Sequence, residues 1–173
     1  MGLDYKSEAP WEAEAEFSRL LEQACQGYAS VTLIANSIGA YFAMCARLDS
    51  RIERAYFISP VVDMERLIRG MMQAAGVTEQ DLRAQGEIQT PFGETLSWAY
   101  LQYAKAHALG WAAPTAILYG ENDALTALGT MTAFADRIHA PLTVMPGGAH
   151  WFHTPEQMAF LDAWLRKESN NGA

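Results

Sequence analysis

One short stretch decides how this chain folds: Val31-Thr32-Leu33-Ile34-Ala35-Asn36-Ser37-Ile38-Gly39-Ala40-Tyr41. Residues 31–34 form an apolar run rich in β-branched side chains, which predicts a buried strand. Residues 40–48 are apolar and rich in alanine, which predicts a packed helix. Small residues stand two positions before and after Ser37, as a sharp turn from strand to helix requires, because bulky side chains there would clash. Such a turn presents the serine hydroxyl at the helix start, where backbone N–H groups favour developing negative charge.

The composition is that of an ordinary globular protein. Half of the 173 residues are apolar and 18% are charged, which favours a single domain, residues 1–173, with a sizeable core. The net charge of −8 argues against a nucleic acid or an anionic membrane surface as a partner. The N-terminal residues 1–6 show no apolar h-region, so no signal peptide is expected, and no apolar stretch reaches membrane-spanning length.

The cysteines and histidines give no sign of a disulfide framework or a metal site. Cys25 and Cys45 have no Cys-x-x-Cys spacing, so a reduced, cytoplasmic protein is expected. No histidines and cysteines are grouped with the spacing of metal ligands. We therefore expect neither a metal nor a cofactor.

The rest of the chain alternates between strand and helix patterns. Three further apolar runs predict strands at residues 55–58, 115–119 and 141–145. Helices are predicted from Pro10, over residues 64–75, 94–108 and 126–138, and from Thr78 and the Thr154 capping box. Residues 86–93 are predicted to be a loop, and residues 169–173 a disordered tail. This order predicts the α/β class, with a doubly wound, mainly parallel sheet and flanking helices.

Three polar residues follow three of the predicted strands. Ser37 follows the first strand, Asp123 the third and His150 the fourth. In a doubly wound sheet the carboxyl ends of the strands meet at one edge, where functional groups gather. We therefore expect these three side chains to converge there.

The local sequences around these residues resemble those of the α/β-hydrolases. Residues 35–39, Ala-Asn-Ser-Ile-Gly, resemble the G-x-S-x-G nucleophile elbow of that family, with Ala35 in place of the first glycine. Residues 119–123 resemble its acid turn, and residues 147–150 its histidine loop, and the order Ser, Asp, His is also the family's order. The resemblance covers roughly residues 11–168 and implies a truncated α/β-hydrolase fold with a small helical cap.

The resemblance implies a serine hydrolase that cleaves a small carboxylic ester, or less favourably a thioester or a C–C bond, through an acyl-enzyme. Ser37 is then the nucleophile, His150 the base that takes its proton, and Asp123 the group that orients the histidine. The N–H of Ile38, the residue after the nucleophile, is expected to donate to the oxyanion.

The insertion over about residues 64–110 corresponds to the family's cap over the site. Apolar and aromatic residues of this segment are candidates for an acyl pocket, with packing in the core as the alternative: Met71, Met72, Phe92, Trp98 and Tyr100. Asp63 stands where some family members carry the acid, but a cap for the helix that begins at Met64 is the favoured interpretation. His153 is expected to be a structural or rim residue.

One part of the family pattern is missing. The family has strands before the elbow strand, and a loop after one of them supplies a second oxyanion donor. Only one helix is predicted before Val31, so no residue is assigned as that donor. The alternative function is therefore a weak or inactive hydrolase-fold protein that binds a small molecule or a partner chain.

The lack of predicted strands before Val31 also bears on the oligomeric state. Without an earlier strand beside it, the strand over residues 31–35 is predicted to be an exposed edge, unless residues 3–5 add a short stub. An apolar edge without proline or charge is a template for pairing with another chain. We therefore expect a homo-oligomer, most simply a two-fold dimer, joined through this edge.

Overall fold

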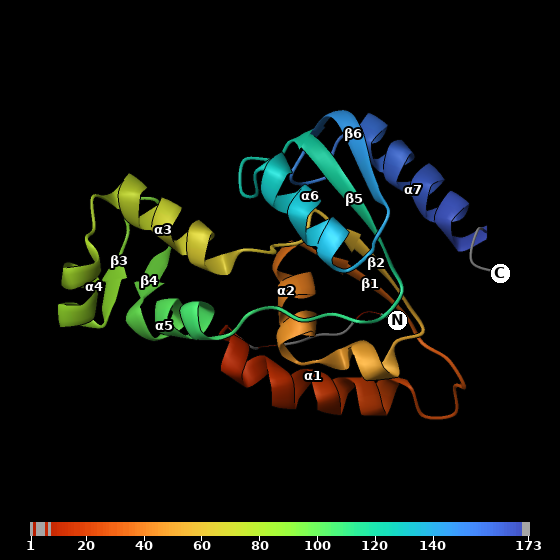
Figure 1. Ribbon diagram of the computed structural model, residues 1–173, viewed down its shortest axis with the longest axis horizontal. Helices are drawn as coiled ribbons and strands as arrows, with labels where there is room; N and C mark the ends of the chain where they lie inside the picture. Colours follow the sequence, from red (N-terminus) through yellow and green to blue (C-terminus); the bar gives the residue numbers. More distant parts are fainter. Residues whose placement is uncertain (1, 3–5, 7, 171–173) are drawn as a thin grey trace. The chain divides into compact units, whose positions relative to one another are not determined.

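The computed structural model describes residues 2, 6 and 8–170, and the chain forms two compact units (Figure 1). The first unit extends to Val62 and resumes at Gly110, and the second unit is Asp63–Leu109. The bounds of the second unit are close to those predicted for the insertion. The predicted stub at residues 3–5 lies outside the described residues.

A parallel sheet forms the centre of the first unit. Its strands are β1 (Thr32–Asn36), β2 (Arg54–Ile58), β5 (Thr115–Asn122) and β6 (Leu142–Ala149), in the order β1-β2-β5-β6. All three pairings are parallel, so the carboxyl ends of the four strands lie at one edge. The predicted fold class, a parallel sheet with flanking helices, is confirmed.

The helices of the first unit pack against this sheet or against one another. They are α1 (Pro10–Ala24), α2 (Ser37–Cys45), α6 (Leu128–Arg137) and α7 (Pro155–Asn170), with a short 3₁₀ turn, η1 (Leu48–Arg51). Figure 1 shows α7 on one side of the sheet and α6 on the other. Trp164 of α7 packs edge-on against Tyr56 of β2, with 5.9 Å between ring centroids, in the core on its side of the sheet. On the opposite face of β2, Phe57 contacts Trp111 at 5.1 Å.

Several predicted boundaries were wrong. The elbow helix begins at Ser37 and ends at Cys45, so Leu48 falls in η1. Both β5 and β6 continue beyond the glycines that were expected to end them, because those glycines allow the two strands to approach closely. Ser169 and Asn170 belong to α7, and the rest of the predicted tail lies outside the described residues.

The second unit contains a hairpin that was not predicted. It consists of α3 (Met64–Ala75), α4 (Glu79–Gln85), β3 (Glu87–Gln89), β4 (Thr95–Ser97) and α5 (Trp98–Ala106). The predicted helix over residues 94–108 is present as α5, but it begins at Trp98, because residues 95–97 form β4. Within the predicted loop over residues 86–93, residues 87–89 form β3, which pairs antiparallel with β4. Gly93, with a φ of 93°, and the Thr90 hydroxyl, which bonds to the Glu94 backbone, form the turn between them.

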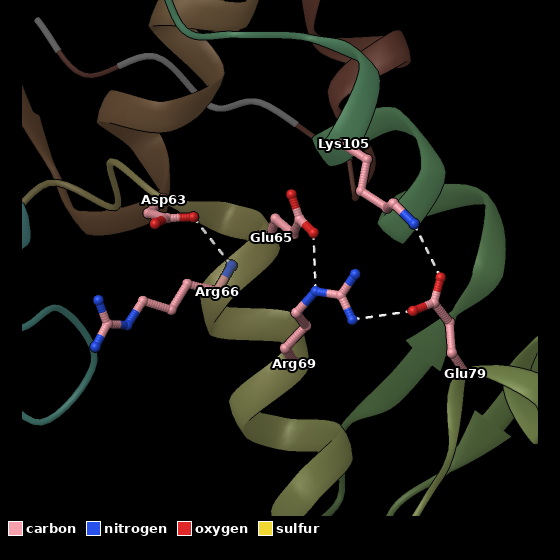
Figure 2. A network of polar contacts seen from close by, with 6 residues as sticks. All are labelled: Asp63, Glu65, Arg66, Arg69, Glu79 and Lys105. Atoms are coloured by element: carbon pink, nitrogen blue, oxygen red, sulfur yellow. Dashed lines mark hydrogen bonds and ion pairs between the residues drawn. The ribbon is translucent and has the colours of Figure 1, made fainter.

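Charged side chains connect the helices of the second unit (Figure 2). Arg69 of α3 bonds to Glu65 at 2.8 Å and to Glu79 at 3.0 Å, and Lys105 of α5 bonds to the same Glu79 at 2.9 Å. The hydrogen bonds from Lys105 and Arg69 lower the pKa of Glu79. These pairs are exposed, so they orient the helices more than they stabilise them.

Helix caps fix the starts of α3 and α4. Asp63 accepts a hydrogen bond from the backbone N–H of Arg66 at 3.0 Å (Figure 2), which confirms that it caps α3. Thr78 and Asp81 form the reciprocal capping box of α4, so the predicted helix start is confirmed.

Among the described residues, β1 has a neighbour on one side only, so it is an edge strand as predicted. Thr32 and Ile34 are exposed, and Ile34 keeps 57% of its surface in contact with solvent. No helix in the described part of the chain has the length and apolar character needed to cross a membrane.

Candidate active site

Ser37 lies at the turn between β1 and α2. It is the first residue of α2 and has a φ of 49°, in the left-handed region that non-glycine residues rarely adopt. Its carbonyl accepts a hydrogen bond from the N–H of Val61 at 3.2 Å, and the residue is 5% exposed. The small residues around it allow this backbone geometry, which aims the side chain away from the sheet.

The structure brings Ser37, His150 and Asp123 together, and we call these residues the candidate triad. Ser37 Oγ is 2.7 Å from His150 Nε2, and His150 Nδ1 is 2.7 Å from Asp123 Oδ2. Because a carboxylate can only accept, the imidazole proton is on Nδ1 and donates to Asp123. The unprotonated Nε2 then accepts the hydroxyl proton of Ser37. This is the geometry of a nucleophile beside an oriented base.

The surroundings of Asp123 keep it ionised. Burial alone would raise its pKa, but hydrogen bonds from His150 and from the backbone N–H groups of Thr126 and Leu125 outweigh burial, so the pKa lies below its usual range. The two N–H groups donate to Oδ1 at 3.1 and 2.8 Å. With one oxygen held by the backbone, the other is aimed at His150.

Tyr119 supports this turn from β5. Its hydroxyl donates to the carbonyl of Thr126 at 2.7 Å. Burial and the negative charge of Asp123 raise the pKa of Tyr119, so it stays protonated and keeps donating. Sequence reasoning missed Tyr119, Leu125 and Thr126. Tyr119 reads as an ordinary buried strand residue, and the positions of Leu125 and Thr126 after Asp123 are common in turns of this kind.

A close approach of β5 to β6 sets the distance between Asp123 and His150. A Cβ atom added at Gly120 would lie 2.4 Å from the carbonyl oxygen of Ala149 and 2.6 Å from that of Gly148. The pairing of the two strands shifts register between Gly120 and Asn122. Only glycine permits this contact, after which the two strands carry their polar residues to the same point.

A second strained serine lies next to this site. Ser59 directly follows β2, has a φ of 41° and is fully buried. Its N–H donates to the carbonyl of Leu118 at 2.8 Å, but its hydroxyl has no partner among the described residues. Non-glycine residues in such conformations are held by the surrounding structure at a free-energy cost.

The other predicted site residues have different positions. Ile38 follows Ser37 at the start of α2 and is 38% exposed. The five pocket candidates all lie in the second unit: Met72 is buried, Phe92 is exposed, and Met71, Trp98 and Tyr100 are half-buried. Their contact with a substrate stays a prediction. Within the described residues, no group of His, Cys, Asp or Glu side chains could hold a metal ion.

No family model matches this sequence, and no curated protein is significantly similar to it. Solved structures match its fold. Est1E from Butyrivibrio proteoclasticus matches with a TM-score of 0.71 and 15% identity, over 94% of this chain and 72% of Est1E. Alpha/beta hydrolase domain-containing protein 10 from mouse gives 0.69 and 14%, over 92% and 70% of the two chains. Est816, an N-acyl homoserine lactone degrading enzyme, gives 0.59 and 18%, over 94% and 75%. At these identities the likeness concerns the fold.

Proposed function

We propose that this chain, which has the α/β-hydrolase fold, is a serine hydrolase that cleaves a small carboxylic ester. The observation that carries the proposal is the contact of 2.7 Å between Ser37 Oγ and His150 Nε2, within the reach that a general base needs. Est816 degrades a lactone, which is a cyclic ester, and this supports an ester as the substrate class.

In the first half of the reaction, Ser37 attacks the acyl carbon while His150 Nε2 takes the hydroxyl proton. Asp123, hydrogen-bonded to Nδ1, stabilises the imidazolium that forms. His150 then gives the proton to the oxygen of the leaving alcohol. The C–O bond breaks, and the acyl group remains bound to Ser37.

In the second half, a water molecule replaces the alcohol. His150 takes a proton from the water as the water attacks the acyl carbon, and returns it to Ser37 Oγ when the acid leaves. The N–H of Ile38 donates to the oxyanion in both halves. Hydrolases of this fold use a second donor, for which no residue is assigned here, and losing one donor typically costs on the order of 10²–10³ in turnover.

The candidates for binding the acyl group stay those predicted from the sequence. They are Met71, Met72, Phe92, Trp98 and Tyr100. Their apolar and aromatic side chains suit an acyl chain without charge.

A covalent fluorophosphonate probe tests the proposal, because it reacts with an activated serine. We expect the folded wild-type chain to be labelled at Ser37, located by peptide mass spectrometry, and to hydrolyse p-nitrophenyl acetate. Ser37→Ala should abolish both. The matched control is Ser50→Ala, an exposed serine in η1, which should change neither. A folded wild-type chain that resists the probe would favour the alternative, a hydrolase-fold protein that binds a small molecule or a partner chain without cleaving it.

A further inference from the structure

Exposed apolar side chains surround the buried candidate triad in the first unit. Ser37 and His150 are each 5% exposed, and the Asp123 side chain is fully buried. Yet Ile38, Leu125 and Trp151, each one or two residues further along the chain, are 38%, 44% and 60% exposed. The buried polar residues are therefore followed in the chain by apolar side chains that are exposed to solvent.

Trp151 is held in this exposed position by its neighbours. The next residue, Phe152, is buried in the core cluster that contains Trp164. His153 Nδ1 donates to the carbonyl of Trp151 at 2.6 Å, and the N–H of His153 donates to Gln157 Oε1 at 3.2 Å. At this point of the chain Phe152 is in the core, and the indole of Trp151 lies at the surface.

The indole also contacts the base of the proposed reaction. The rings of Trp151 and His150 meet edge to face, with 5.2 Å between centroids and 88° between planes. Aromatic side chains contribute large, rigid contact areas. One placed beside an imidazole therefore offers an apolar surface for whatever group approaches that imidazole.

The direction of proton transfer identifies the part of the substrate that approaches the imidazole of His150. In the proposed acylation step, His150 Nε2 must reach the oxygen of the leaving alcohol, whereas the acyl carbon is bonded to Ser37. The alcohol therefore lies on the His150 side of the site. We infer that Trp151 is a specificity-determining residue whose indole contacts the alcohol part of the substrate. It selects esters whose alcohol carries an aromatic or bulky apolar group. This inference rests on the proposed function.

The test compares acetate esters that share one acyl group and differ in the alcohol: ethyl, cyclohexylmethyl and benzyl acetate. We expect Trp151→Ala to lower kcat/KM for the two bulky esters by about tenfold, the usual effect of losing an apolar contact of this size. For ethyl acetate the change should be under about twofold. Trp151→Phe should retain most of the preference. The matched control is Tyr28→Ala, which removes an exposed aromatic side chain before β1, at the other end of the sheet.

A second series keeps ethanol as the alcohol and varies the acid from acetate to phenylacetate. Trp151→Ala should not change the ratios within this series. Equal losses for all esters would show that Trp151 only positions His150, and losses that follow the acid would place the indole on the acyl side; either result overturns the inference. A wild-type chain that the probe does not label overturns the proposed function itself. A labelled chain that shows no preference among the alcohols overturns the inference alone.

Discussion

Two serines, each directly after one of two paired strands, adopt left-handed backbone conformations: Ser37 follows β1 and has a φ of 49°, and Ser59 follows β2 and has a φ of 41°. Conformations of this kind cost of the order of 1–3 kcal/mol each and cluster at functional sites. The elbow motif predicts strain at Ser37. Nothing in Ile58-Ser59-Pro60 distinguishes Ser59 from an ordinary strand end, because its conformation depends on strands that are distant in sequence.

Asp123→Asn tests the role of Asp123 in the candidate triad with little change in side-chain size. The amide donates as well as accepts, so it no longer fixes the proton on His150 Nδ1, and Nε2 loses its role as acceptor from Ser37. We expect kcat to fall on the order of 10⁴-fold, with little change in KM. Circular dichroism should show an unchanged fold. Activity within tenfold of the wild type would contradict the role of Asp123.

The pH profile tests the same residues. Only neutral imidazole accepts a proton, so kcat/KM should rise from pH 5 to pH 8 and then level off. The pKa of Asp123 is lowered in the folded state. Its contribution to stability is therefore present above the pKa of the unfolded chain, and is lost as pH falls through the folded value. Urea denaturation at a series of pH values measures this loss of stability. A flat rate from pH 5 to 8 would rule out His150 as the base.

Ser59→Gly should stabilise the protein. Glycine adopts the left-handed conformation without a Cβ clash, and the substitution removes a buried hydroxyl that lacks a partner. After the entropy cost of glycine, we expect a gain of about 1–2 kcal/mol in the free energy of unfolding. Urea denaturation measures it. A loss of stability would show that the hydroxyl has a partner in solution.

At the scale of elements, the contact between β5 and β6 determines the site. In Gly120→Ala, the new Cβ would meet the backbone of Gly148 and Ala149, and backbone cannot move aside as a flexible side chain does. We expect the strands to separate locally, at a cost of about 1–3 kcal/mol in the free energy of unfolding, with a larger proportional loss of probe labelling. The matched control is Gly129→Ala on α6, where an added Cβ meets nothing within 4 Å. Equal labelling of both variants would show that this contact does not position His150.

The elements differ in how well the sequence predicts them. Short apolar runs predicted all four strands of the sheet, and in the central strands β2 and β5 the run is continuous because both faces are buried. The ends of β5 and β6 were missed, since Gly120 usually signals a turn and here serves a close contact. The hairpin of β3 and β4 was missed because each strand has only three residues. A strand of three residues is too short to show the alternation of apolar and polar residues that predicts a strand. Its pairing depends on the surrounding fold.

In the candidate site, the residues that belong to local sequence motifs were predicted. The residues whose role depends on contacts formed only in the folded chain were missed. Ser37, Asp123 and His150 each follow a strand, so the sheet brings them together. Tyr119 and Trp151 act through contacts that the linear sequence does not mark. The five pocket candidates stay predictions.

At the scale of the whole molecule, the edge of β1 predicts self-association. Ile34 is 57% exposed on a strand that, among the described residues, pairs on one side only. Such an edge favours pairing with a second copy. We expect light scattering to show a dimer at micromolar concentration. Ile34→Lys should give a monomer, because lysine on an edge strand opposes pairing. A wild-type monomer whose Thr32 to Ile34 amides exchange slowly with deuterium would show that the chain covers this edge itself.

The second unit is one continuous segment, entered after Val62 and left before Gly110. It has buried side chains on α3, α4, β4 and α5, and its own ion pairs. A gene that exchanged this segment with a relative would need only two crossover points, and neither would interrupt the sheet or separate Ser37 from Asp123 and His150. Such an exchange would replace the whole second unit and leave every residue of the candidate triad in its original sequence context.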